Sequence, residues 1–335
     1  MRKLFYFFPA IAGWVIPSFA LAHVKWFVDS EQILAQNTAP TNWYSISSPA
    51  VWIWLGLIVL AVIIGSQLDK IAKVPAWLTN LAQNHSKVIN RVAQTFLGLF
   101  LISIALLWKI VIIPEADGDT NTILTVLQYI QIILGLMFVF DFKVKWASIS
   151  LIVITIFSTI YSGGIEALLE NLILLSLAFY FWINAEDNQS KIGSLKPYAV
   201  PILRWGTGLS LIILAITEKL LHPELSLAFL DIHQWNFMQP LFPWFTNELF
   251  VLSTGFAEII FGVMFISGYL TRITTIAIAV FFALSVTTML IQFGAWETED
   301  LVVYAAAVIM LAYGSGQYMT LRSCLNKALK RPQIN

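Results

Sequence analysis

The chain of 335 residues is 59% hydrophobic and 11% charged, with zero net charge and a mean hydropathy of +0.79. A soluble globular protein of this length needs more charge to cover its surface, so the composition predicts an all-α, polytopic membrane protein whose main partner is the lipid bilayer. The balanced charge argues against a nucleic-acid partner. The single cysteine, Cys324, excludes an internal disulfide and a CxxC redox pair.

Residues 1–22 have the form of a signal peptide. A basic start is followed by an apolar segment, which Pro9 and Pro17 interrupt, and by Ala20-Leu21-Ala22 just before His23. The alternative is an uncleaved anchor helix, because the apolar segment is nearly long enough to span a bilayer. Residues 23–49 are polar and show no sustained periodicity, which predicts a periplasmic segment.

Nine spanning helices are expected after the signal segment. The first, at 50–66, belongs to a unit at 50–90 that ends in a basic cytoplasmic loop with room for an amphipathic surface helix. The outer loop at 222–247 is rich in aromatic residues and is expected to lie on the membrane surface as an interfacial belt or as a lid. The remaining spans are predicted at 92–113, 123–140, 147–162, 165–183, 200–221, 248–267, 272–291 and 300–316.

Lys and Arg gather in alternate loops, which sets the orientation. The positive-inside rule assigns these loops and the basic tail at 317–335 to the cytoplasm. The opposite loops, at 115–119, 162–164, 222–247 and 295–300, contain neither Lys nor Arg. The sequence therefore predicts a bacterial inner-membrane protein with a periplasmic mature N-terminus and a cytoplasmic C-terminus.

Two parts of the chain repeat the same order of polar and small residues. The segment QIILGLMFVFDFKVK from Gln131 matches EIIFGVMFISGYLTR from Glu258, and each is preceded by a helix that opens on an arginine, Arg91 or Arg204. We expect two tandem, parallel four-helix repeats at 91–185 and 200–316, related about the membrane normal. A chance likeness between apolar segments is the alternative.

The second half resembles the DoxX-like superfamily. The resemblance rests on an arginine-opened helix that ends in a lysine, then E-x-x-x-G, a later glycine with Thr-Arg, and a final G-x-G. The residues are Arg204, Gly208, Lys219, Glu258, Gly262, Gly268, Arg272, Gly314 and Gly316. It covers residues 200–316 well and 91–185 more weakly, and it implies a four-helix membrane fold linked to quinone, thiosulfate or oxidative-stress chemistry.

Glu258 is the main candidate for a functional residue, because it lies near the centre of an apolar span. A charge at that depth costs on the order of 3 kcal/mol, so it needs a partner, a proton or a wet cavity. We expect Lys219 to pair with Glu258 or with Asp300. The competing interpretation is a structural polar contact between helices, worth about 1 kcal/mol.

Three histidines are predicted on the outer side and are candidate metal ligands: His23, His222 and His233. Cleavage after Ala22 would make His23 the N-terminus, where its amine and imidazole suit Cu(II). Alternatively, His222 caps a helix end.

Three functions follow from these patterns. The first is a membrane subunit or assembly partner in periplasmic redox or stress metabolism, which requires a protein partner. The second is a quinone-linked oxidoreductase subunit that uses the periplasm-facing acidic residues. Since the sequence has no motif that holds a flavin, haem or cluster, this enzyme would need a redox partner. The third is a copper-handling membrane protein built on His23.

Overall fold

The structure is a computed structural model that describes residues 45–72, 74–106, 122–159, 164–233, 236, 238–293, 300–316 and 318–324. Within these ranges the chain forms helices and no strand, which confirms the all-α class. The predicted signal peptide, most of the segment at 23–49, His23 and the end of the tail lie outside the described residues.

The helices begin and end close to the predicted spans. In chain order they are α3 (Pro49–Ile71), α4 (Ala76–Asn84), α5 (Ser86–Leu106), α6 (Thr122–Val139), α7 (Val144–Ser158), α8 (Gly164–Glu170), α9 (Leu172–Ala185), the 3₁₀ turn η4 (Gly193–Leu195), α10 (Lys196–Leu214), the π-helical η5 (Ala215–Leu221), α11 (Pro223–His233), α12 (Asn247–Ser267), α13 (Thr271–Phe293) and α14 (Leu301–Tyr313).

Four of these helical stretches are long and apolar enough to cross a bilayer: 49–71, 86–106, 193–221 and 247–267. Shorter apolar helices occupy the other five predicted spans, at 125–139, 144–158, 172–185, 271–283 and 301–313. The structure therefore fits a membrane protein, with four candidate membrane-spanning helices among the described residues.

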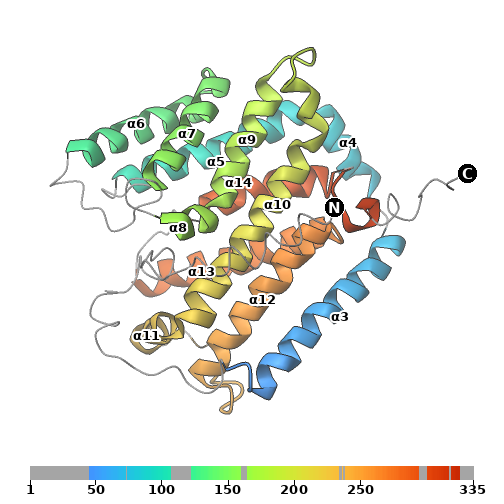
Figure 1. Ribbon diagram of the computed structural model, residues 1–335, viewed down its shortest axis with the longest axis vertical. Helices are drawn as coiled ribbons and strands as arrows, with labels where there is room; N and C mark the ends of the chain where they lie inside the picture. The colour runs from blue at the N-terminus through green and yellow to red at the C-terminus, as the bar shows by residue number, and fades with distance from the viewer. Residues whose placement is uncertain are drawn as a thin grey trace, which may run out of the picture.

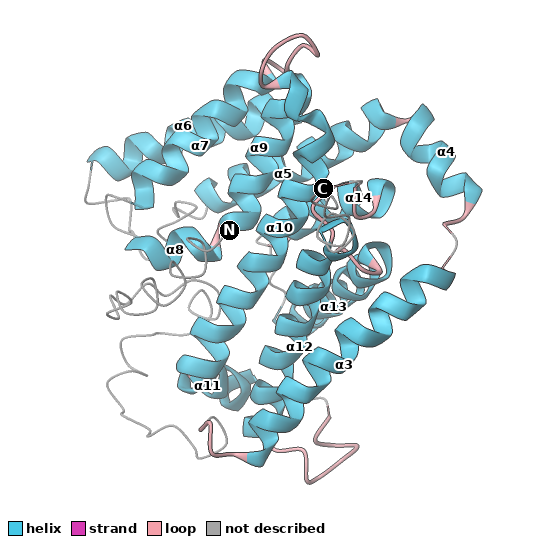
Figure 2. Cartoon of the chain, turned by 45° about the vertical axis from the view of Figure 1, so that its right-hand side comes forward, coloured by secondary structure: helices cyan, strands magenta, loops and turns pink. Residues whose placement is uncertain are grey.

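Four helices form the centre of the molecule. Helix α9 packs along α10, and α14 packs along α5. Helices α6 and α7 cover this centre on one side, and α12 covers α10 on the other (Figures 1 and 2). The largest fully buried aliphatic side chains come from α5, α7, α9 and α10: Leu97, Leu101, Ile104, Leu151, Leu174, Leu177 and Leu203.

Helix α3 is the outermost helix and lies beside α12 (Figures 1 and 2). Only 6% of the residues in its most apolar stretch are buried, so its surface is consistent with contact with lipid. Two contacts hold it to α12 and the turn that follows. Trp54 stacks on Phe256 with ring centroids 5.8 Å apart, and Asp69 Oδ1 accepts a hydrogen bond from the backbone N–H of Leu270 at 3.2 Å.

The segment predicted as an outer loop at 222–247 contains a short helix, α11, in its first half. Pro223 suits a helix start, since it has no N–H to leave unpaired, and Glu224 in the first turn complements the helix dipole. Leu225 and Leu230 are buried, which docks this helix on the protein. The second half of the segment does carry exposed apolar side chains, at Leu241, Phe242 and Trp244.

Candidate functional site

The candidate site lies where η5, which continues α10, packs against α12. Gly208 in α10 and Gly262 in α12 allow a close approach of the two backbones. A Cβ on Gly262 would lie 2.5 Å from the carbonyl oxygen of Gly208, and this distance is too short for a non-bonded contact. Small residues at such crossings let membrane helices pack tightly. Gly255 makes similar room one helical turn before Glu258, because a Cβ there would lie 3.1 Å from Lys219 Cβ.

An ion pair joins the two elements at this crossing. Lys219 Nζ lies 3.0 Å from Glu258 Oε2, and the two side chains are 13% and 15% exposed. The prediction that Lys219 pairs with Glu258 or Asp300 is confirmed for Glu258. A charge-assisted hydrogen bond of this kind is stronger than one between neutral groups. It gives Glu258 the partner that a carboxylate on an apolar helix requires.

The π-helical η5 directs successive side chains to different neighbours. Lys219 reaches Glu258 on α12, whereas Thr217 Oγ1 donates to Glu170 Oε1 at the end of α8, at 2.7 Å. Glu218, between them, is buried, and its backbone oxygen accepts from the hydroxyl of Ser226 on α11 at 3.3 Å. Single π-helical turns are frequent at functional sites because they alter which side chains share a face.

Glu170 connects the first half of the chain to η5. Its carboxylate accepts from Thr217, and its backbone oxygen accepts from the hydroxyl of Ser210 on α10. The helix predicted at 165–183 is interrupted here, with Asn171 between α8 and α9. Because the Ser210 hydroxyl donates to it, the backbone oxygen of Glu170 has a hydrogen-bond partner on the other side of the interface between α8 and α10.

Two other candidate residues, Gln131 and Asp300, are buried. Gln131, which aligns with Glu258, is buried, and its Nε2 donates to the backbone oxygen of Leu101 at 3.0 Å. Asp300 is buried at the start of α14, and Lys219 forms its ion pair with Glu258 instead. Among the described residues, the lysine–carboxylate pair joins η5 and α12, and the amide of Gln131 in α6 bonds to the backbone of α5.

The candidate metal ligands are only partly described. His222 follows η5, and its Nδ1 lies 3.0 Å from Glu224 Oε1. His233 ends α11, and His23 lies outside the described residues. In the described ranges no group of three or more His, Cys, Asp and Glu is arranged to hold a metal ion. A copper site built on His23 stays a prediction.

The acidic groups around η5 define what the site can do. Glu170 at the end of α8, Glu218 in η5 itself and Glu258 on α12 bring three carboxyl groups to this region, and Lys219 pairs with Glu258. A carboxyl group among apolar helices is costly to ionise, so this region suits the exchange of a proton. The sequence predicts the two charged partners, Lys219 and Glu258. The roles of Gly255 and Thr217 depend on packing between helices, and no sequence pattern indicates them.

Comparison of the chain with protein-family models, with curated proteins and with solved structures finds no match. The DoxX-like resemblance therefore rests on the sequence motif at 200–316, with weaker support at 91–185. The geometry around η5 and α12 is the structural basis for a function.

Proposed function

We propose that the chain is a multi-spanning inner-membrane protein with a DoxX-like core, and that it acts as a membrane subunit or assembly partner in periplasmic redox or stress metabolism. Its functional site is the Lys219–Glu258 pair. The single observation that carries this proposal is an ion pair of 3.0 Å held between two apolar helical stretches that are each long enough to span a bilayer. Charged groups in such stretches are costly and mark functional sites by default.

Partial exposure of the pair favours a functional role over a purely structural contact. Complete burial would strengthen the attraction between the charges, but it would also cost each of them its hydration and close the pair to any third group. Lys219 and Glu258 instead keep 13% and 15% of their side-chain surface exposed. Both ends of the pair thus stay within reach of a proton, a ligand or a partner protein.

The proposed duplication has support from matched contacts. Arg91 donates to the Phe138 carbonyl oxygen at the end of α6, and Arg204 donates to the Phe265 carbonyl oxygen at the end of α12. These pairs occupy corresponding positions in the sequence alignment of the two halves. The crossing of Gly98 with Gly135 likewise corresponds to that of Gly208 with Gly262, since each pair brings backbone atoms within reach of the opposite Cβ position.

The proposed duplication also accounts for which helices pack against each other. The last helix of each proposed repeat lies along the first helix of the other, as α9 does with α10 and α14 with α5. Such an exchange is what a two-fold relation about the membrane normal produces. Within it, the neutral Gln131 and the charged Glu258 make the second half the specialised one.

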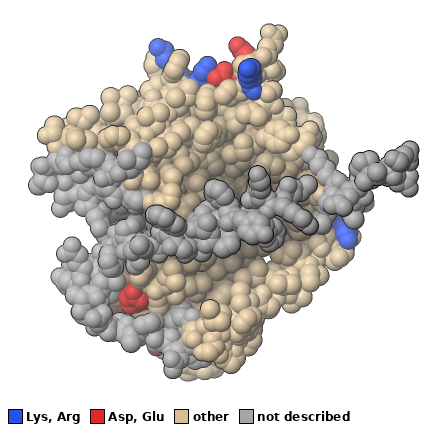
Figure 3. Space-filling model, in the orientation of Figure 1, with Lys and Arg blue, Asp and Glu red and all other residues tan. Residues whose placement is uncertain are grey.

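The distribution of charge supports the proposed orientation. On the face in Figure 3, the blue Lys and Arg atoms lie along the upper edge and at the right, whereas the large tan surface between and below them shows none among the described residues. The upper edge carries the turns that join α6 to α7 and α9 to α10, which the positive-inside rule assigns to the cytoplasm (Figure 1).

A complementation assay tests the proposed site. In a strain that lacks the chain and shows a redox-stress phenotype, Glu258→Gln and Lys219→Met should each fail to restore growth when the amount of protein in the membrane is matched to wild type. The double variant, in which no uncompensated charge remains, should fail as well. Gln131→Met is the matched variant, since it alters the corresponding position of the first half without burying a charge there and should leave function intact. Full complementation by Glu258→Gln would remove this site from the mechanism.

Pull-down from native membranes distinguishes the candidate functions. A co-purifying protein that is lost in Lys219→Met supports the subunit role. Stoichiometric quinone supports the quinone-linked enzyme, and copper that depends on His23 supports the copper-handling protein.

A further inference from the structure

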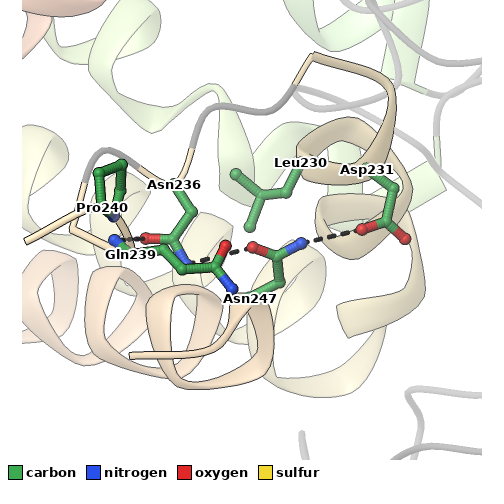
Figure 4. Close-up of a pocket in the computed structure, with 6 residues that line it drawn as sticks. All are labelled: Leu230, Asp231, Asn236, Gln239, Pro240 and Asn247. Atoms are coloured by element: carbon green, nitrogen blue, oxygen red, sulfur yellow. Dashed lines mark hydrogen bonds between the residues drawn. The ribbon is translucent and has the colours of Figure 1, made fainter. Parts of the chain in front are cut away.

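A polar pocket lies at the end of the molecule where α12 begins, apart from the Lys219–Glu258 pair. Its volume is about 500 Å³, within the range of small-molecule sites, and it is open to the surface. Helix α11, the turn after it and the first residue of α12 supply its walls (Figure 4). The lining residues are Leu230, Asp231, Asn236, Gln239, Pro240 and Asn247.

A chain of hydrogen bonds fixes the polar wall (Figure 4). Asn236 Oδ1 accepts from the backbone N–H of Gln239 at 3.2 Å, and its Nδ2 donates to Asn247 Oδ1 at 3.1 Å and to the Phe245 oxygen at 2.8 Å. Asn247 Nδ2 then donates to Asp231 Oδ1 at 2.8 Å. Asn236 is buried with its hydrogen-bonding capacity in use, so it is the framework of the wall.

Part of the hydrogen-bonding capacity of the lining residues is not used among the described residues. Asp231 Oδ2 is an acceptor that makes no hydrogen bond to the described residues, and Asn247 keeps one N–H. The side-chain amide of Gln239 has no partner among the described residues and offers both donors and an acceptor. Leu230 and Pro240 add apolar surface beside these groups.

This set of groups selects a neutral ligand. Among the described residues that line the pocket there is no Lys, Arg or His to neutralise an anion. A hard cation needs several oxygen ligands. Asp231 is the one carboxylate among the described lining residues, and Asn247 turns its N–H rather than its oxygen toward it, so the pocket does not suit such a cation. Hydroxyl groups donate and accept, so they satisfy an acceptor carboxylate, an N–H and an amide together.

We infer that this pocket binds a polyhydroxylated, neutral ligand such as a sugar, either free or as the headgroup of a lipid. Adjacent hydroxyls engage Asp231, Asn247 and Gln239, and the C–H face of the ring packs on Leu230 and Pro240. The lipid source is compatible with the position of the pocket, because the exposed Leu241, Phe242 and Trp244 follow Pro240 directly. The inference goes beyond the proposed function and uses none of its residues.

Two near-isosteric variants test this inference. Asp231→Asn keeps the oxygen that Asn247 bonds and replaces the ligand-facing oxygen, and Gln239→Leu removes the amide but keeps the backbone bond to Asn236. Asp187→Asn, in the loop between α9 and α10, is the matched control. Full-length protein in phosphatidylcholine nanodiscs is titrated with glucose by saturation-transfer NMR. In a second arm, retention of monoglucosyl diacylglycerol is compared with that of diacylglycerol by native mass spectrometry.

Glucose should bind with a Kd on the order of 1 mM, or the glucolipid should be retained selectively. Either signal should fall at least about tenfold in Asp231→Asn and in Gln239→Leu and stay unchanged in Asp187→Asn. Glucose binding identifies a free ligand, and glucolipid retention alone identifies a headgroup. Lack of binding in both arms, or equal binding by both pocket variants with monodisperse protein, would overturn the inference.

Discussion

Gly208 and Gly262 face each other where α10 crosses α12, and a Cβ on Gly262 would lie 2.5 Å from the Gly208 oxygen. The crossing matters for the site because η5 continues from α10 and carries Lys219 toward Glu258. Separation of the backbones at the crossing would draw the ammonium away from the carboxylate. The glycines and the charged pair therefore form one unit.

Gly262→Ala should destabilise the fold and weaken the ion pair, because backbone atoms have to move to admit the new methyl group. We expect a loss of about 1–3 kcal/mol. Gly56→Ala in α3 is the control, since a Cβ there meets nothing within 4 Å and should change stability by about 0.5 kcal/mol or less. Thermal unfolding in detergent measures both, and equal melting temperatures for the two variants would contradict the crossing's role.

The Lys219–Glu258 pair should show strong energetic coupling. Lys219→Met alone leaves Glu258 without its cation, and Glu258→Gln alone leaves the ammonium without its anion, so each should cost about 3–5 kcal/mol. The double variant should recover much of this loss, because no uncompensated charge remains. A thermodynamic cycle from thermal unfolding measures the coupling. Additive losses in the double variant would show that the two charges do not stabilise each other.

Thr217→Val tests the link between the two halves. The substitution removes the hydroxyl that donates to Glu170 Oε1 and should lower stability by about 1–2 kcal/mol. Thr254→Val is the matched control, since the Thr254 hydroxyl bonds only carbonyls of its own helix, Phe250 O and Val251 O. Unfolding of the two variants should differ clearly, and an equal response would mean that the Thr217–Glu170 bond contributes nothing of its own.

Arg204 is expected to anchor the segment after α14. Its guanidinium donates to the Phe265 and Ile266 oxygens at the end of α12 and, at 2.7 Å, to the Met319 oxygen. Gly268 leaves room for this group with φ of +78°, so Gly268→Ala meets both backbone strain and the guanidinium. Arg204→Met and Gly268→Ala should expose residues 318–324 to protease. Protection equal to that of the wild type in both would contradict the anchor.

The pH response of Glu186 is predicted from its partners at the end of α9. The hydrogen bond from Lys145 Nζ, at 2.9 Å, lowers the pKa of the Glu186 carboxyl below its ordinary value of 4.5. Trp182 Nε1 also donates to it, at 3.1 Å. Because the folded pKa is the lower one, this contribution to stability is present above about pH 4.5 and is lost as the pH falls through the folded value.

Lys145→Met should therefore raise the pKa of Glu186 toward 4.5. NMR titration of ¹³C-labelled glutamate, with the signal assigned by Glu186→Gln, measures the shift. The same pKa in Lys145→Met and wild type would show that Lys145 does not hold this carboxylate.

Composition and apolar runs predict an all-α membrane protein and the position of most of the described helices. Apolar runs long enough for a bilayer leave few alternatives to helix, because every backbone group in lipid must find its partner within the chain. The cost of a lone carboxylate in such a run also singled out Glu258 and led to its pairing with Lys219. Local sequence was less informative at 223–233, where a short amphipathic helix lies within a segment predicted as a loop.

The contacts that build the site are visible in the folded chain and not in its sequence. Lys219 pairs with Glu258 and not with Asp300 because η5 packs against α12. That packing depends on Gly208 and Gly262, which the sequence does not distinguish from other glycines. Thr217 reaches Glu170 across more than forty positions of chain because α8 and α10 pack together. Hydrogen bonds and close helix crossings act over a few ångströms in space, whereas periodicity and composition report only on neighbours along the chain.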